Sequence, residues 1–451
     1  MVAPTHEPRR SPIRHPARLI TTAFAVAVFA GTALLMIPAS TEDPGGAGLL
    51  DAFFTATSAV TVTGHITVDT PAFWSTFGEA VILVLIQLGG IGIMTLAALI
   101  LVGISGRIGL RQRLIAQHEV GVLTLGEVRG VVRRVLVLSA SVEAAAAVVL
   151  SLWFLVRYDE PLLRAGWLGL FHAVSAFNNA GFALFSDSLI GFVSDPVVNV
   201  VVMVAITIGG LGVPVLGELT RDRLHWTRWS LHTKLVLVTS AGLVLVGWIV
   251  ICLFEWTNDA TMGPLSTPES LLAGLFQSVT PRTAGFNTID FGGVREATML
   301  FTSALMFIGA APASTGGGIK VTTFAMLGFV ILSEMRGDDD VNLFQRRIPS
   351  VAQRQGLAIA LIGVGVVFAT TLALVEITGF ELGPTLFEVT SAFGTVGLST
   401  GITADLPVLG KLLLTVLMFA GRVGPLTVGT ALAVRSRDQR FRLPEERPLI
   451  G

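Results

Sequence analysis

The sequence predicts an all-α integral membrane protein built from four repeats, each with two membrane-spanning helices and a short re-entrant helix between them. Three observations support this prediction. Of the 451 residues, 52% are hydrophobic and 14% are charged, whereas soluble domains carry about 25% charged residues. Several apolar runs reach the roughly 20 residues that cross a bilayer. Finally, one motif recurs four times, each time between two apolar runs.

The first apolar run begins at Leu19 and follows Arg14 and Arg18. A basic segment ahead of an apolar run is also typical of a secretory signal peptide. This run is long for a signal peptide and no clear cleavage site follows it, so we expect it to be retained as the first spanning helix. The first runs of the four repeats are residues 19–38, 135–156, 235–254 and 357–377.

The recurring motif begins with phenylalanine and ends with glycine. Its four copies are Phe54–Gly64, Phe171–Gly181, Phe276–Gly285 and Phe387–Gly397, the third being one residue shorter. The apolar runs that follow are residues 77–102, 196–219, 299–332 and 408–434, and they share a second repeated glycine at Gly89, Gly209, Gly309 and Gly421.

The apolar start of each motif is too short to cross a membrane, as Ala52–Val60 illustrates. It therefore predicts a re-entrant helix followed by a loop. Irregular backbone at membrane depth is tolerated only where protein or a water-filled cavity surrounds it. The fold class that follows has eight spanning helices and four re-entrant pore helices around a pseudo-fourfold pore. Ordinary glycine-rich outer loops are the alternative.

The repeats also set the expected domain organisation. We expect the four repeats at residues 19–106, 135–220, 235–335 and 355–434, the second helix of repeat three being broken. Linkers at 107–134, 221–234 and 336–354 join them, and tails occupy 1–18 and 435–451. Each linker and tail carries basic residues, such as Arg107, Arg111 and Arg113. The positive-inside rule places these segments and both termini in the cytoplasm.

Four such hairpins can form a cation filter. Each re-entrant helix directs its partly negative C-terminal end at the pore axis, and the returning loop offers backbone carbonyls that replace a cation's water. Glycine lets this loop turn without a Cβ clash. We expect the asparagines and Arg282 to point behind the filter, because a cationic group in the file would repel cations. The expected lining residues are Thr61, Val62, Thr63, Gly64, Asn178, Asn179, Ala180, Gly181, Arg282, Thr283, Ala284, Gly285, Gly394, Thr395, Val396 and Gly397.

The second apolar run of repeat three is interrupted. Proline and three successive glycines cannot maintain a helix in lipid, and an ionisable residue at membrane depth is functional by default. A passive kink, with Lys320 capping exposed carbonyls, is the alternative. The residues of the interruption are Gly309, Ala310, Ala311, Pro312, Ala313, Ser314, Thr315, Gly316, Gly317, Gly318 and Lys320.

The ends of the four motifs resemble the Trk/Ktr/HKT superfamily of potassium transporters. The residues that carry this resemblance are Thr61–Gly64, Asn178–Phe182, Arg282–Asn287 and Gly394–Ser399. The resemblance extends over about residues 19 to 434, and eight helices without an additional N-terminal pair look most like the KtrB branch, the membrane subunits of Ktr systems. It implies potassium uptake through the filter. Gly64 favours potassium, because serine at this position is associated with sodium conduction in the family.

The resemblance also assigns roles below the filter. It implies that the interruption in repeat three is an intramembrane gate loop and that Arg422 forms an electrostatic barrier. Arg422 lies where repeats one and two have Gly90 and Gly210; a buried ion pair, for which Glu143 is a candidate partner, is the alternative. We expect the polar residue that follows each motif phenylalanine to hydrogen-bond its neighbours rather than bind the ion. These residues are Thr55, His172, Gln277 and Glu388.

The same resemblance implies a homodimer with one pore per subunit and a KtrA-like ring of cytosolic nucleotide-binding regulatory subunits. Potassium is the expected transported ion, sodium is a candidate coupling or activating ion, and no organic cofactor is expected in this chain. The chain should lie in the lipid bilayer of the cell membrane, without a nucleic acid partner.

Three alternatives stay open. The first is the ion-translocating subunit of a potassium-pumping ATPase, which should be longer and carry added helices. The second is a sodium- or proton-coupled cation symporter. The third is an intramembrane enzyme, and it is disfavoured because the apolar runs hold no facing aspartates and no Ser-His pair.

Overall fold

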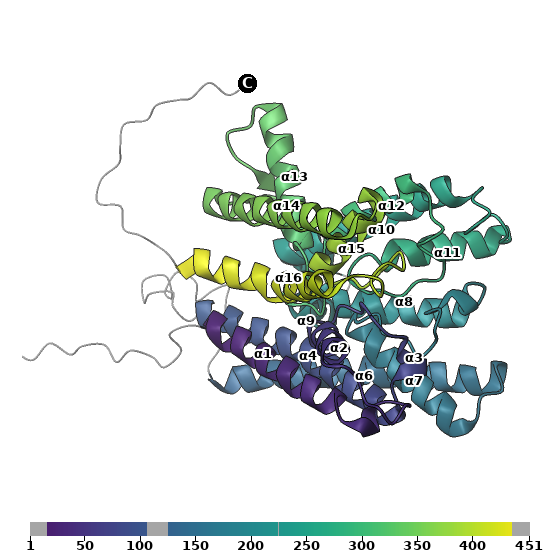
Figure 1. Ribbon diagram of the computed structural model, residues 1–451. Coiled ribbons are helices and arrows are strands. Elements are labelled where there is room, and N and C mark those ends of the chain that lie inside the picture. The colour runs from purple at the N-terminus through teal and green to yellow at the C-terminus, as the bar shows by residue number, and fades with distance from the viewer. Residues whose placement is uncertain (1–15, 106–124, 224, 435–451) are drawn as a thin grey trace, which may run out of the picture.

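The computed structural model describes residues 16–105, 125–223 and 225–434. Within them, four repeats of helix, re-entrant helix and helix follow one another, and the long helices lie side by side around short helices near the centre (Figure 1). Predictions that concern residues 1–15, 106–124 and 435–451 lie outside the described residues. They include most of both tails and the basic residues Arg107, Arg111 and Arg113.

The repeats have corresponding helices. The first helices are α1 (Pro16–Leu35), α6 (Leu125–Arg157), α10 (Leu231–Glu255) and α14 (Ser350–Thr378). The re-entrant helices are α2 (Leu49–Thr61), α7 (Leu162–Phe177), α11 (Thr267–Val279) and α15 (Leu382–Gly394). The second helices are α4 (Thr76–Ser105), α8 (Pro196–Leu211) with α9 (Val213–Asp222), α12 (Glu296–Phe307) with α13 (Val321–Arg336), and α16 (Val408–Val434).

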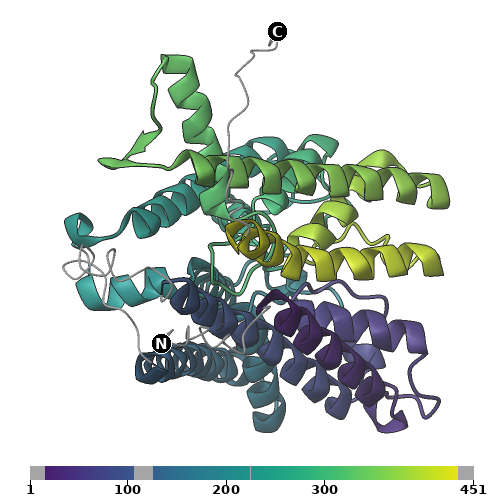
Figure 2. The same cartoon turned by 90° about the vertical axis from the view of Figure 1, so that its left-hand side faces the viewer.

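Short elements connect these helices. They are η1 (Pro38–Ser40), α3 (Thr70–Phe73), η2 (Ile190–Phe192), η3 (Trp226–Arg228) and the antiparallel strands β1 (Asn342–Leu343) and β2 (Arg346–Arg347). The hairpin follows α13, and the two together project from the rest of the molecule (Figure 2).

Local sequence fixes where several helices begin. The Asp195 carboxylate accepts hydrogen bonds from the N–H groups of Val197 and Val198 at 2.8 and 3.1 Å, and Pro196 occupies the first turn of α8. Ser230 caps α10 in the same way through the Thr233 N–H. Such caps satisfy donors that have no partner within the helix. They therefore set the boundary between loop and helix at both sites.

The second helix of repeat two differs from its prediction. The apolar run 196–219 is expected to form the second spanning helix of repeat two without a break, but α8 and α9 meet at Gly212 with a bend of 101°. Gly212 has φ +84°, and a Cβ there would lie 2.5 Å from the Pro312 carbonyl oxygen. The Val213 N–H donates to the Ala313 carbonyl oxygen at 3.1 Å. The bend thus lies against the interruption of repeat three, which the structure places between Phe307 and Val321 as predicted.

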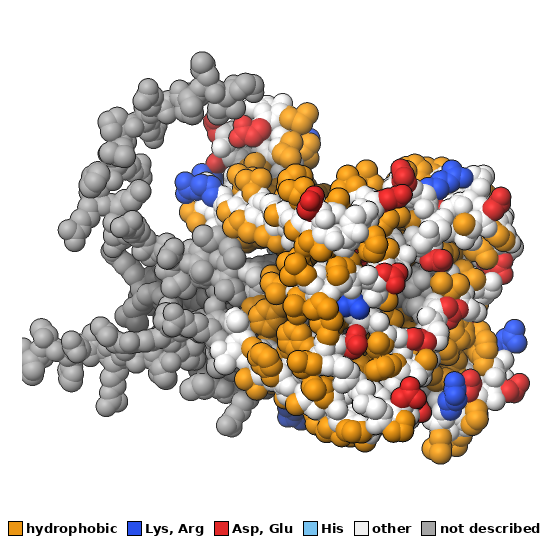
Figure 3. Space-filling model, in the orientation of Figure 1, with side chains coloured by type: hydrophobic (Ala, Val, Ile, Leu, Met, Phe, Trp, Pro, Cys, Tyr) orange, Lys and Arg blue, Asp and Glu red, His pale blue; other side chains and the backbone are white. Residues whose placement is uncertain are grey.

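The surface is that of a protein embedded in lipid. Within the described residues, α10, α14 and the Val132–Arg157 part of α6 are each long and apolar enough to cross a membrane, and the bent pair α8 and α9 makes a fourth span. The remaining spans are the helices that occupy the corresponding positions in the other repeats: α1, α4, α12 with α13, and α16. Figure 3 shows many hydrophobic side chains on the described part of this face, and most of the charged side chains there lie in its right-hand half. A large apolar surface of this kind marks a membrane or partner contact.

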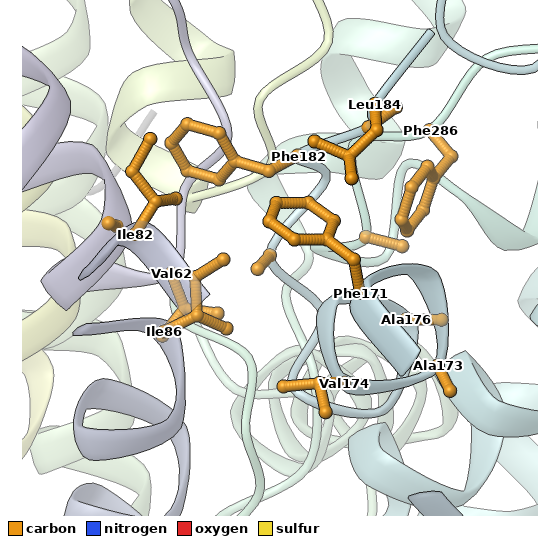
Figure 4. Packing of buried hydrophobic residues seen from close by; sticks show 14 of the residues in the cluster. Val62, Ile82, Ile86, Phe171, Ala173, Val174, Ala176, Phe182, Leu184 and Phe286 are labelled. Atoms are coloured by element: carbon orange, nitrogen blue, oxygen red, sulfur yellow. The ribbon is translucent and has the colours of Figure 1, made fainter. Parts of the chain in front are cut away.

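The largest buried cluster surrounds the loops that follow the re-entrant helices. Phe182 and Phe286, which directly follow two of the motif glycines, are fully buried. Figure 4 shows them near Phe171 of α7 and Ile82 of α4. Burying a phenylalanine contributes about 1.5–3 kcal/mol. This packing therefore holds the motif loops in place between the repeats.

Candidate functional site

The four motif glycines form a closed ring. A Cβ added to any of them would lie closer than 3.0 Å to a carbonyl oxygen of the next repeat, a distance that real Cβ atoms do not show. For Gly64, Gly181, Gly285 and Gly397, these oxygens belong to Ala180, Ala284, Val396 and Thr63, respectively. Because the fourth glycine meets the first repeat, all four loops share one axis. Most of their lining residues are buried, and Gly181, Arg282 and Gly397 are half-buried, which contradicts the alternative of ordinary outer loops.

The loop backbones also share one conformation. Each glycine has a positive φ, between 71° and 93°. The residue two positions earlier is also left-handed in every loop, with φ between 51° and 76°, and these residues are Val62, Asn179, Thr283 and Thr395. For residues other than glycine this conformation costs about 1–3 kcal/mol and persists only where the surroundings impose it. The surroundings thus impose the same strained turn four times.

A hydroxyl group braces each loop from within its own repeat. Ser58 and Ser391 accept hydrogen bonds from the N–H groups of Gly64 and Gly397 at 3.0 and 3.1 Å. In repeats two and three, the equivalent hydroxyls of Ser175 and Thr280 donate to the carbonyl oxygens of Phe182 and Phe286 at 2.8 and 2.5 Å. The sequence reasoning missed these residues. Their signal is a serine or threonine four residues after every motif phenylalanine.

A second set of braces holds the chain beyond the glycines. In three repeats, the polar residue after the motif phenylalanine accepts a hydrogen bond from the N–H group three residues past the glycine. This confirms the expected hydrogen bonding for these three repeats, but the prediction is wrong for Thr55, whose buried hydroxyl has no partner among the described residues. The pairs are His172 with Leu184 (3.2 Å), Gln277 with Thr288 (2.7 Å) and Glu388 with Thr400 (3.0 Å). Glu388 also lies 3.4 Å from the buried His65, which follows Gly64. Repeats one and four are therefore linked behind the ring.

The polar side chains at the base of the ring point behind it, as predicted. Arg282 donates to the carbonyl oxygen and hydroxyl of Ser240 on α10, at 3.0 and 2.9 Å. With its amide oriented to satisfy both ends, Asn179 donates to the Ile206 carbonyl oxygen of α8 at 3.1 Å. Both side chains are thus held by the neighbouring helices α10 and α8.

Asn178 belongs to a buried network that sequence reasoning did not predict. Its amide donates to the Gln87 side-chain oxygen at 2.7 Å and to the Glu143 carboxylate at 3.2 Å. Gln87 donates to both carboxylate oxygens at 3.1 and 2.9 Å. Glu143 thus joins α6, α4 and the base of the repeat-two loop. It has no contact with Arg422 among the hydrogen bonds and ion pairs of the described residues, so the alternative of an ion pair between Glu143 and Arg422 is not found there.

The interruption of repeat three lies directly beneath the ring. A Cβ on Gly316 would collide with the Thr283 side chain, and one on Gly317 with the Thr395 side chain. Backbone hydrogen bonds from Ala311 and Thr315 to the Gly210 and Gly209 carbonyl oxygens, at 3.1 and 3.2 Å, tie the segment to α8. The segment is therefore packed between two of the loops above and the bent helix beside it.

Two cations hold this segment. The Lys320 ammonium group donates to the carbonyl oxygens of Gly316 and Gly317 at 2.8 and 3.4 Å, which is the capping that the passive-kink alternative describes. The buried Arg422 guanidinium donates to the Thr315 carbonyl oxygen and, at 3.2 Å, to the Gly89 carbonyl oxygen of α4. Arg422 thus bridges the segment and repeat one, with backbone oxygens as its partners.

The opposite side of the ring opens into a cavity of about 400 Å³. All four motif glycines line its floor, and Asp69, Asp187 and Asp290 line its walls. Carboxylates around a narrowing cavity raise the local concentration of cations. The axis therefore runs from an acidic vestibule through a ring of carbonyl oxygens to a segment held by two cations.

This arrangement defines a class of protein, the multi-pass membrane proteins with one cation pathway formed by four linked hairpins. Residues 5–442 match the family model TrkH, described as a cation transport protein. This chain belongs to the TrkH family of cation transport proteins.

Individual relatives and a solved structure agree with that assignment. The chain is 40% identical over 444 residues to Ktr system potassium uptake protein B of Bacillus subtilis, covering 97% of each chain. It is 34% identical over 450 residues to the potassium/sodium uptake protein NtpJ of Enterococcus hirae, again covering 97% of each. The crystal structure of the potassium transporter TrkH from Vibrio parahaemolyticus matches with a TM-score of 0.74 at 19% identity, covering 94% of this chain and 86% of that one. The last match establishes the shared fold.

Proposed function

We propose that this chain takes up potassium across the cell membrane and that the sixteen predicted lining residues form its selectivity filter. The closed ring of glycines and carbonyl oxygens is the observation that carries this proposal. Carbonyl oxygens at a fixed spacing replace the hydration shell of a cation. The braces from Ser58, Ser175, Thr280 and Ser391 hold that spacing against collapse. The four unlike copies of the loop supply one coordination site.

The interruption from Gly309 to Lys320 acts as the gate. It lies on the axis beneath Thr283 and Thr395, so an ion that leaves the filter meets it before the cytoplasm. Its hydrogen bonds to α8 place it against the bend at Gly212, and a movement of α9 would be transmitted to it. Arg422 raises the electrostatic barrier at this level, because its charge has no carboxylate partner among the described residues.

The similarity to membrane subunits of Ktr systems supports a proposal about the partners of this chain. A membrane subunit of a Ktr system works with a regulatory subunit, and a KtrA-like ring of nucleotide-binding subunits would act on the cytoplasmic ends of the helices. We also propose a homodimer with both termini in the cytoplasm, and a transport role without enzymatic activity. The name of the Enterococcus relative supports sodium as a second ion.

Growth of a bacterium that lacks its own potassium uptake tests the proposed function. Expression of this chain together with a Ktr regulatory subunit should restore growth at limiting potassium. Gly397→Phe, produced in the membrane at the same level, should not, because its side chain would occupy the ring. Equal growth with both chains, or no growth with either, would refute uptake through this ring.

Neutralising the vestibule should slow uptake at limiting potassium. We expect Asp290→Asn to lower the initial rate about twofold at low ionic strength, since a unit charge about 10 Å away contributes ~0.4 kcal/mol in water. The effect should vanish at high concentrations of an impermeant salt, which screens exposed charges. Asp259→Asn, on an outer loop that does not line the cavity, is the matched control. If the uptake rate of Asp290→Asn were lowered equally at low and high salt, electrostatic attraction of potassium by Asp290 would be excluded.

Removing the charge of Glu143 should weaken potassium binding. In Glu143→Gln, an amide nitrogen replaces an oxygen that accepts from Gln87 or Asn178, and an unsatisfied buried donor costs about 1–3 kcal/mol. We therefore expect a higher potassium KM with less change in maximal rate, measured as rubidium uptake into vesicles. Glu255→Gln removes an equally buried carboxylate at the outer end of α10. It should lower thermal stability without raising KM, and equal KM changes in both variants would contradict a role at the filter.

A further inference from the structure

A lateral cavity of about 380 Å³ lies between α8 and α10. Its wall is mostly apolar, with Leu237, Val244, Leu245 and Trp248 of α10 on one side. Leu245 is 53% exposed on the surface that faces lipid. Pockets for small molecules have volumes of about 300–1,000 Å³, apolar walls and a few placed polar groups. This cavity therefore has the size and lining of a ligand site that opens to the membrane.

The inner end of the cavity is cationic. Arg282, at the base of the repeat-three loop, lines it together with Ser240. Two guanidinium nitrogens donate to Ser240, and a guanidinium carries five N–H donors, so donors remain for another acceptor. Arg282 is partly accessible whereas Pro281 and Thr283 on either side are buried. Among the described residues it makes no ion pair.

A cation at membrane depth without an anion is unfavourable, and a carboxylate that bonds both arms of a guanidinium would compensate it. The same wall includes Gly210 and Ala310. These residues belong to the bent helix and to the interruption of repeat three. An occupant of the cavity would therefore contact the base of the filter loop and the segment below it at once.

We propose that this cavity binds a long-chain fatty acid, with its carboxylate on Arg282 and its chain along α10 toward the lipid. The depth of Arg282 selects this class of ligand. A carboxylic acid can enter a medium of low dielectric constant as the neutral form and then release its proton to the aqueous phase as the carboxylate pairs with the guanidinium. A phosphodiester head group stays charged, and its transfer to that depth is costly. The inference goes beyond the proposed uptake of potassium, and its test does not require transport.

Quenching of tryptophan fluorescence by a brominated stearic acid tests the proposal, because Trp248 lines the cavity. The full-length protein is reconstituted in phosphatidylcholine vesicles and titrated. We expect a saturable component of quenching that is lost in Trp248→Phe. In Arg282→Gln the Kd should rise about tenfold or more, as expected for the loss of one charge-assisted contact. Arg295→Gln, an arginine at the outer start of α12, should keep the wild-type Kd.

Two further experiments separate the contribution of the carboxylate charge from that of the cavity volume. The brominated methyl ester has no carboxylate and should show no saturable quenching in the wild type. Ala241→Phe places a ring in the cavity without removing the charge and should abolish the saturable component, which tests the site even if Arg282→Gln does not fold. Equal affinity for acid and ester, an unchanged Kd in Arg282→Gln, or quenching that never saturates in the wild type would each overturn the proposal.

Discussion

Deletion of Ala313–Gly318 should give a chain whose potassium flux is large and independent of a regulatory subunit. The deleted residues pack beneath the filter loops and contain the carbonyl oxygens that Lys320 and Arg422 hold. Without them, the path below the filter should be open. We expect rubidium uptake into vesicles without a regulator to rise about tenfold or more, equivalent to a barrier lower by about 1.4 kcal/mol.

Ion selectivity provides the control for this deletion. The braces of the filter lie outside the deleted segment, so the variant should still prefer potassium to sodium. A flux that is equal for both ions would indicate a nonspecific leak. Lys320→Gln is a milder variant, because it removes only two hydrogen bonds and leaves the backbone hydrogen bonds to α8. Its rubidium uptake should lie between that of the wild type and that of the deletion variant. Unchanged uptake in a folded deletion variant would favour the passive kink.

Much of the fold was accessible from sequence because it is repeated. One filter loop is an unremarkable glycine turn, but four copies at matching positions predict one axis, and the ring through Gly64 and Gly397 has this arrangement. The interruption of repeat three was also predictable, because Pro312 and three glycines cannot continue a helix. The repetition thus predicts the shared axis, and local backbone chemistry predicts where the helix of repeat three is interrupted.

The rest depends on contacts between distant segments. Gly212 alone gave no clear sign of a 101° bend, because glycine is also common where helices in membranes pack closely, although Pro214 in the first turn of α9 is a local signal of a helix start that the sequence reasoning missed. It bends where Pro312 and Ala313 of another repeat approach it. The partner of Glu143 could not be predicted either: a charge in an apolar helix suggests a countercharge, but the structure supplies the amides of Gln87 and Asn178. Side-chain pairing across repeats is not encoded in the spacing of one repeat.

Gly64→Ser should reduce the preference for potassium over sodium. The Cβ would lie closer than 3.0 Å to the Ala180 carbonyl oxygen and 3.1 Å from the Gly181 Cα, and φ of +93° is unfavourable for serine. Neither backbone group can move aside as a flexible side chain would, so the loop of repeat one must shift away from repeat two. We expect the selectivity ratio in competitive uptake to fall about tenfold, equivalent to about 1.4 kcal/mol.

Gly401→Ser is the matched control for Gly64→Ser, because it introduces the same backbone strain without changing the geometry of the ring. Gly401 has a similar φ of +97° and lines the vestibule, but a Cβ there would meet no atom within 4 Å. Both variants should therefore lose thermal stability through the unfavourable φ, and only Gly64→Ser should lose selectivity. The reason is that discrimination depends on where four carbonyl oxygens lie around the ion, whereas strain in the vestibule moves none of them. If both variants kept the wild-type selectivity, Gly64 would not belong to the site that distinguishes the two ions.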